Sequence, residues 1–74
     1  MFLVKVECKN VSVEKLAEIL LIFAKWFRIW LYKKKVYASF MIETLTLLES
    51  FTNTLQIKKI KFRFYRIEEI DYEK

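Results

Sequence analysis

Aromatic and basic side chains alternate along three segments of this chain, and this combination can bind nucleic acid without any catalysis. Bases stack on aromatic rings for about 1–3 kcal/mol each, and Lys and Arg neutralise phosphates. The alternation places one set of residues on a common face: Lys5, Glu7, Arg28, Trp30, Tyr32, Lys35, Tyr37, Lys59, Lys61, Arg63 and Tyr65. Six of these are basic, four are aromatic and one is acidic, which predicts an interaction face and not a reaction centre.

The same residues also suit a protein interface. Trp, Tyr and Arg anchor many protein contacts, and an aromatic patch rimmed by charge is typical of a dimer surface. A small domain also gains stability from self-association. Three interpretations therefore stay open: a homodimer or other protein contact, which we expect first, single-stranded RNA or DNA, and a solvated sheet stiffened by cross-strand pairs.

The composition excludes several catalytic classes. The chain has no Gly, no Pro and no His, and it has a single Cys. Phosphate-cradling loops need Gly, zinc sites draw on several Cys and His residues, and the usual triads need an imidazole. We therefore expect no enzyme activity, no cofactor and no metal. Cys8 cannot form an internal disulfide, so we expect it to be a small buried hydrophobic residue.

The most apolar stretch, residues 16–31, is not expected to cross a membrane. It contains Glu18, Lys25 and Arg28, and its uninterrupted apolar part covers only residues 19–24. A span needs about 20 apolar residues, and a central charge costs about 2.5–3.5 kcal/mol. No basic segment precedes the alternating run 2–8, so we expect no signal peptide. The single Cys and these absences together predict a cytoplasmic protein.

Hydrophobic periodicity predicts six elements. Period two indicates strands at 2–8, 28–32, 35–40 and 57–66, and period 3.6 indicates helices at 13–26 and 41–53. Ser12 is the expected N-cap of the first helix, whose apolar stripe comprises Leu16, Ile19, Leu20, Phe23 and Phe27. An unbroken helix over 13–33 is the competing interpretation. Asn10 suits a positive φ angle, Asn53 suits a helix end, and residues 68–74 suit a frayed end or strand extension.

Lys33, Lys34 and Lys35 interrupt the alternation between the two middle strands and predict a hairpin turn. They lack the Asn-Gly or Asp-Gly pair that two-residue hairpins prefer. A charged tip discourages aggregation at a sheet edge, which is the structural interpretation of these lysines. The functional one is that they extend a stripe of phosphate contacts.

The middle of the chain resembles the histidine-containing phosphocarrier (HPr) family. The family's second hairpin and helix commonly read Y-x-G-K-x-x-x-A-K-S-I, and similar places here hold Tyr32, Lys34–Val36, Ala38, Ser39 and Met41–Leu47. The resemblance covers residues 10–50 and implies the family's fold. The family's phosphorylated His would fall near Ser12, its Arg and Pro near Glu14 and Lys15, and its regulatory serine near Phe40. The family's last helix has no counterpart, and without an imidazole phosphotransfer is not implied.

Together these elements predict a single domain over residues 1–74 with an α+β, βαββαβ open-faced sandwich. Two helices would cover one face of a four-stranded antiparallel sheet. Right-handed crossovers leave a ferredoxin-like or an HPr-like strand order. The uncovered face would carry the proposed interaction residues: Lys5, Arg28, Trp30, Tyr32, Tyr37, Lys59, Lys61, Arg63 and Tyr65.

Overall fold

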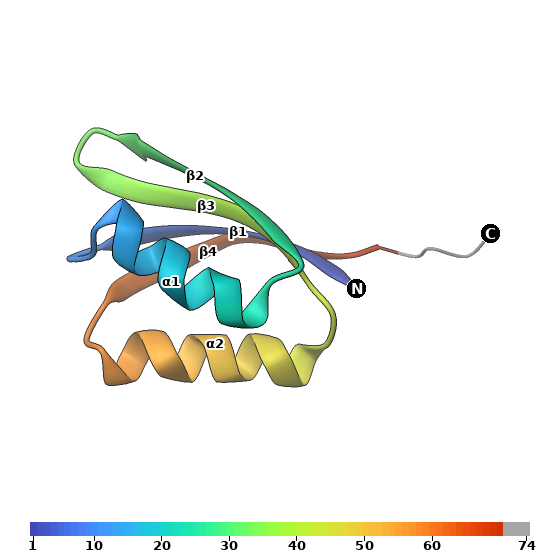
Figure 1. Cartoon of the computed structure of the whole chain (residues 1–74). Helices are drawn as coiled ribbons and strands as arrows, with labels where there is room; N and C mark the ends of the chain where they lie inside the picture. Colours follow the sequence, from blue (N-terminus) through green and yellow to red (C-terminus); the bar gives the residue numbers. More distant parts are fainter. Residues whose placement is uncertain (71–74) are drawn as a thin grey trace.

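The computed structural model describes residues 1–70 and has the expected βαββαβ order. The elements are β1 (Phe2–Lys9), α1 (Val13–Phe23), β2 (Trp26–Tyr32), β3 (Lys35–Ile42), α2 (Leu45–Ile57) and β4 (Lys61–Glu69). Both helices lie on one side of the sheet, which leaves the other side uncovered (Figure 1). No described helix is long and apolar enough to cross a membrane.

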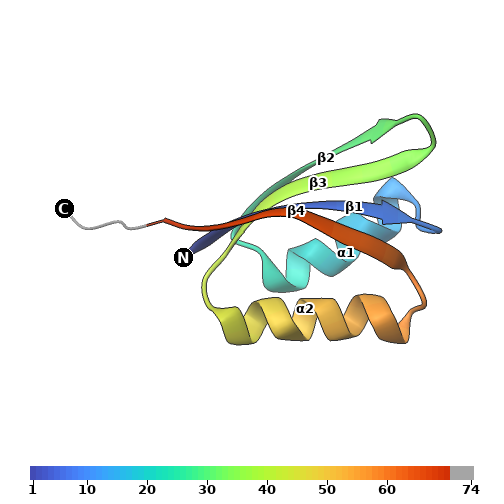
Figure 2. The ribbon, with the colours of Figure 1, turned by 180° about the vertical axis from the view of Figure 1, so that it is seen from behind.

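The sheet is antiparallel with the strand order β2-β3-β1-β4. Of the two expected orders this is the ferredoxin-like one, in which two split βαβ units interleave. The β2–β3 turn and the β1–α1 and α2–β4 connections meet at one end of the sheet, and the N-terminus and the end of β4 lie at the opposite end (Figures 1 and 2).

The core lies between the sheet and the helices because apolar residues alternate along the strands. Val4, Val6 and Cys8 of β1 and every second residue of β3 are buried, and α1 and α2 add their apolar stripes. Its largest fully buried side chains are Phe40, Phe51, Leu16, Leu20, Ile42 and Leu55. Cys8 is completely buried, as expected, and burial raises the pKa of its thiol to about 12, with nearby Glu7 adding to the shift. The thiol is therefore an inert core group.

The first helix begins as predicted but ends three residues earlier than residue 26. Ser12 accepts a hydrogen bond from the Lys15 backbone N–H at 3.1 Å, and Asn10 has a φ of 62°. The helix stops because Ala24 is extended, and Trp26 already pairs with Met41 in the sheet. The expectation that Phe27 belongs to the helical stripe, and the alternative helix over 13–33, are both wrong. Sheet pairing overrides the helical spacing there.

The second helix is shifted by four residues from the predicted range 41–53. Thr44 is its N-cap and accepts from the Leu47 backbone N–H, while residues 41 and 42 extend β3. The helix continues through Asn53 to Ile57 and ends in a Schellman motif. Lys59 N–H donates to the Gln56 carbonyl and Ile60 N–H to the Leu55 carbonyl. Lys59 has a φ of 59°, so a lysine occupies the place where glycine is usual.

The hairpin between β2 and β3 is built as predicted, with a two-residue loop. Tyr32 pairs with Lys35, and Lys33 and Lys34 have φ values of 51° and 67°. Positive φ at both central positions is the type I′ pattern. The left-handed region is unfavourable for residues with a Cβ atom, so this chain without glycine places two lysines in strained positions.

The last strand begins at Lys61 and not at the predicted residue 57, because α2 and its Schellman turn take residues 57–60. It also extends beyond 66 to Glu69, which confirms a strand extension there. The rest of the predicted tail, 71–74, lies outside the described residues. A register shift marks a bulge: Val6 pairs with Phe64, but Lys5 pairs with Arg66. Tyr65 is thus the extra residue in β4.

Candidate functional interface

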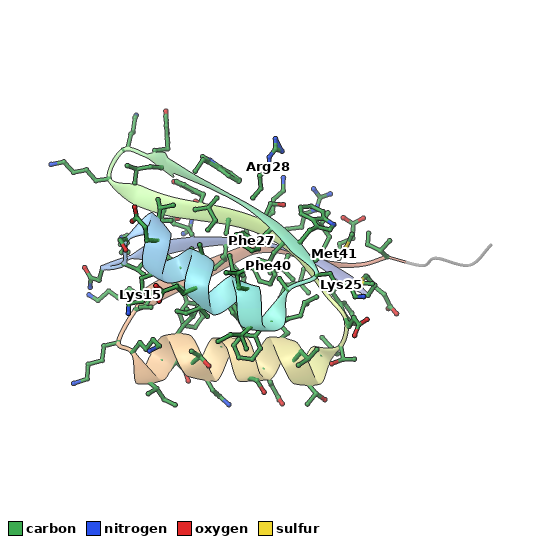
Figure 3. All side chains as sticks on the ribbon, viewed as in Figure 1. Lys15, Lys25, Phe27, Arg28, Phe40 and Met41 are labelled. Atoms are coloured by element: carbon green, nitrogen blue, oxygen red, sulfur yellow. The ribbon has the colours of Figure 1, made fainter. Side chains whose placement is uncertain are left out.

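The uncovered side of the sheet collects most of the predicted interaction residues. Arg28 points away from the helices, whereas Phe27 and Phe40 point between the sheet and the helices (Figure 3). By strand register the predicted residues on the uncovered face are Lys5, Arg28, Trp30, Tyr32, Tyr37, Lys61, Arg63 and Tyr65. Lys59 is the exception, because it lies in the turn before β4. The structure therefore brings eight of the nine residues together.

Trp26, Lys9 and Arg66 also lie on this face, although they were not among the predicted site residues. Trp26 and Lys9 lie beyond the predicted limits of their strands, and their places follow from the pairs Trp26–Met41 and Lys9–Lys61. Arg66 reaches the face because of the bulge, which puts Tyr65 and Arg66 on the same side. The alternating pattern in the sequence of β4 could not have predicted the bulge or the position of Arg66. A longer alternating window would have included Lys9.

A row of parallel aromatic rings crosses the uncovered face. Trp30 and Tyr37 have ring centroids 5.9 Å apart at an interplanar angle of 11°, and Tyr37 and Tyr65 are 6.1 Å apart at 5°. Tyr32 adds a tilted ring 6.4 Å from Tyr37. The strands that carry Tyr37 and Tyr65 flank β1, so these two rings meet above the central strand. The outer rings stay open to solvent, with Trp30 43% and Tyr65 49% exposed.

Glu7 lies under this row and is only 5% exposed, although it belongs to the uncovered face. The Tyr65 hydroxyl donates to Oε1 of Glu7 at 2.6 Å, Lys35 Nζ lies 3.1 Å from Oε2, and Arg63 lies 3.8 Å from Oε1. A buried carboxylate needs such partners to offset the loss of hydration. The four side chains, Glu7, Lys35, Arg63 and Tyr65, tie three strands together.

The electrostatics of the cluster follow from these contacts. The Tyr65 hydrogen bond, and then the Lys35 ammonium, hold the pKa of Glu7 below its ordinary value. The hydrogen bond to Glu7 raises the pKa of Lys35, and desolvation raises the pKa of Tyr37. All these groups therefore keep their usual charge states at neutral pH, and the phenol of Tyr37 stays protonated.

Acidification is expected to weaken the fold through Glu7. Its folded pKa lies below the unfolded value of about 4.5, so its contribution is present above that pH and is lost as pH falls through the folded pKa. Urea unfolding measured from pH 7 downward should therefore show a loss of stability beginning near pH 4.5. In the Glu7→Gln variant, the slope of the unfolding free energy against pH should decrease by an amount that corresponds to up to one bound proton.

Glu49→Gln is the matched control for this prediction, because Glu49 is an exposed glutamate on α2 without an ion pair among residues 1–70. Its pH profile should keep the wild-type slope. Identical slopes for Glu7→Gln and the wild type would contradict the role assigned to Glu7.

Comparison with family models, with curated proteins and with solved structures gives no match for this chain. Within residues 1–70, no three His, Cys, Asp or Glu side chains lie close enough together to hold a metal ion. The geometry of the uncovered face is therefore the basis on which a function is inferred.

Proposed function

We propose that the chain is a non-catalytic binding module whose uncovered sheet face binds single-stranded nucleic acid. The observation that carries this proposal is the row of parallel rings Trp30–Tyr37–Tyr65 between basic side chains. Successive bases stack on such rings with little sequence preference, because every base has a π face. Cations beside the rings are then placed to follow the phosphates.

The charge of the face supports an anionic partner. Two acidic residues lie on it, Glu7 and Glu68, against seven basic ones: Lys5, Lys9, Arg28, Lys35, Lys61, Arg63 and Arg66. Its formal charge is thus +5, equal to that of the whole chain. A basic surface of this kind raises the local concentration and the association rate of a polyanion.

The accessibility of the rings favours a single strand over a duplex. Both helices lie behind the sheet, so within residues 1–70 no helix covers the sheet face that carries the rings (Figures 1 and 2). In a duplex the bases are already stacked and paired, and their faces cannot reach a flat protein surface. Unpaired bases can lie directly on the row.

A second candidate is a homodimer through the same face, favoured by the exposed rings of Trp30, Tyr32 and Tyr65. Large aromatic side chains are common anchors of protein interfaces. Two copies packed face to face would, however, bring two surfaces of like charge together, and such a juxtaposition is unfavourable. Because of this repulsion we propose nucleic-acid binding as the first candidate function and self-association as the second. This order is the reverse of the one expected from the sequence.

The test is a binding titration with oligonucleotides of about ten nucleotides, oligo-dT and oligo-U, at several salt concentrations. Four basic residues of the face, Lys5, Lys9, Arg28 and Lys61, make no ion pair among residues 1–70. With three or four neutralised phosphates, log K should fall with log salt at a slope of about −2 to −3. A duplex of the same length should bind more weakly than the single strand.

Light scattering on the same samples separates the two candidates. A monomer that gains mass with the oligonucleotide and loses it as salt rises supports the proposed function. A stable dimer whose mass changes neither with oligonucleotide nor with salt would overturn it and favour the second candidate.

A further inference from the structure

A basic pocket lies beside the aromatic row, at the end of the sheet that carries the hairpin turn. Its volume is about 190 Å³, and its lining residues are Glu7, Lys9, Lys35, Lys61, Phe62 and Arg63. The four cations come from three adjacent strands, β3, β1 and β4. The pocket therefore exists because the strand order brings these three strands together, and no single segment of the chain forms it.

The charges in the pocket are unbalanced. Glu7 is the one acidic lining residue, and it already pairs with Lys35 and Arg63. Lys9 and Lys61 sit directly opposite each other across β1 and β4, and neither makes an ion pair within residues 1–70. Like charges directly opposite each other in a sheet are destabilising. The four cations and one carboxylate give the pocket a formal charge of +3.

This excess of positive charge matches a phosphate monoester better than a phosphodiester. A monoester carries about −1.5 to −2 charges at neutral pH and has three strong acceptor oxygens. An internal phosphodiester of a nucleic acid carries a single charge. Lys ammonium and Arg guanidinium are the side chains that bind phosphate oxygens, and here both kinds converge.

The position of the pocket connects it to the aromatic row. Arg63 lines the pocket and also lies against Tyr65, with its guanidinium carbon 5.0 Å from the ring centroid. Lys35 lines the pocket, pairs in register with Tyr32 at the hairpin end of β2 and β3, and shares Glu7 with Arg63. A base on the last ring of the row would thus have the pocket next to it.

Resting on the function proposed above, we propose that this pocket binds a terminal phosphate monoester of the single strand whose bases lie on the aromatic row. The module then recognises a phosphorylated strand end and not the interior of a long strand. The shared chemistry, a phosphate monoester dianion, is also offered by free inorganic phosphate. The experiment has to separate these sources.

The experiment compares three versions of one oligonucleotide of about ten nucleotides: with a 5′-phosphate, with a 3′-phosphate and with neither. Binding is measured by calorimetry at fixed ionic strength. We expect at least one phosphorylated end to bind at least about 10-fold more tightly than the bare strand at pH 7.5. The gain should shrink near pH 5, below the monoester pKa of about 6.

Two double variants make the test specific. The variant Lys9→Gln/Lys61→Gln removes two positive charges from the pocket and should abolish the gain from the terminal phosphate. The variant Lys5→Gln/Arg28→Gln removes two charges from the same face outside the pocket and should keep the gain. Both variants should weaken the binding of the bare strand to a similar extent, because each removes two positive charges from the face. Thermal melting verifies that both variants fold.

The outcomes separate the inference from the function on which it rests. Equal affinities for the phosphorylated and bare strands would overturn the inference and leave the proposed function standing. An inorganic phosphate that binds the pocket as tightly as the phosphorylated strand would also overturn it, in favour of free phosphate. Absence of binding by every oligonucleotide at low salt would overturn the proposed function itself.

Discussion

Replacing Trp30 and Tyr65 together by alanine is expected to weaken the binding of a single-stranded oligonucleotide at least about 30-fold. These residues carry the two outer rings of the row and are the more exposed ones, whereas Tyr37 is held between them. Each lost stacking partner costs about 1–3 kcal/mol, so two cost at least about 2 kcal/mol, and 1.4 kcal/mol is a factor of ten. Fluorescence anisotropy at low salt measures the change.

Two controls separate stacking from other effects. Trp30→Phe/Tyr65→Phe keeps an aromatic ring at both positions and removes the hydroxyl that donates to Glu7, so its affinity should stay within a few-fold of the wild type. Ile57→Ala removes a side chain that is 79% exposed in the helical layer, and its affinity should not change. A folded double-alanine variant that binds within about 3-fold of the wild type would contradict the role of the rings.

The same double-alanine variant also informs the homodimer hypothesis. If the face were a protein interface, losing both anchors would lower the mass measured by light scattering, with little dependence on salt. If nucleic acid is the partner, the mass of the protein alone stays that of a monomer. The variant therefore tests both candidates with one preparation.

Phe40→Ala is expected to have the largest effect on stability, about 3–5 kcal/mol. Phe40 is completely buried in the middle of β3, with its ring centroid 4.9 Å from that of Phe51. In register it lies between Phe27 of β2 and Val4 of β1, so its loss leaves a cavity where both layers meet. A domain of this size has a total stability of order 5–15 kcal/mol, so the loss is a large fraction of it.

Urea and thermal unfolding measure this loss through the fluorescence of Trp26 and Trp30, both on β2. The melting temperature should fall by at least about 12 °C, since 1 kcal/mol corresponds to about 4–8 °C in a domain of this length. Leu21→Ala, at a site that is 70% exposed, should change stability by no more than about 0.5 kcal/mol. A loss below about 1 kcal/mol for Phe40→Ala would refute the central place given to this ring.

The faces of the sheet were predictable from the sequence because side-chain direction alternates along a strand. Val4, Val6 and Cys8 are buried while Lys5 lies on the opposite face, as the period of two requires. The Ser12 cap and the positive φ of Asn10 were predictable for a similar reason, since both depend on the chemistry of a few neighbouring residues. Local pattern therefore determined the fold class and eight of the nine predicted face residues.

Element boundaries were less predictable, because the usual stop signals are missing from a chain without Gly and Pro. The second helix passes through Asn53 and ends with a lysine in the glycine position of a Schellman motif. Trp26 and Phe27 fit a helical stripe as well as a strand, and pairing with β3 decides between them. Such competition between local spacing and sheet pairing is resolved only by contacts distant in the sequence.

The tertiary structure alone decided the arrangement of the uncovered face. The strand order puts β1 between β3 and β4, so that the rings of Tyr37 and Tyr65, from the two strands that flank β1, close over Glu7. The bulge in β4 adds Arg66 to the face, and the meeting of three strand ends forms the basic pocket. Residue types and faces are local properties of the chain, whereas strand order and register depend on which distant segments pair, and those pairings placed the charges around the rings.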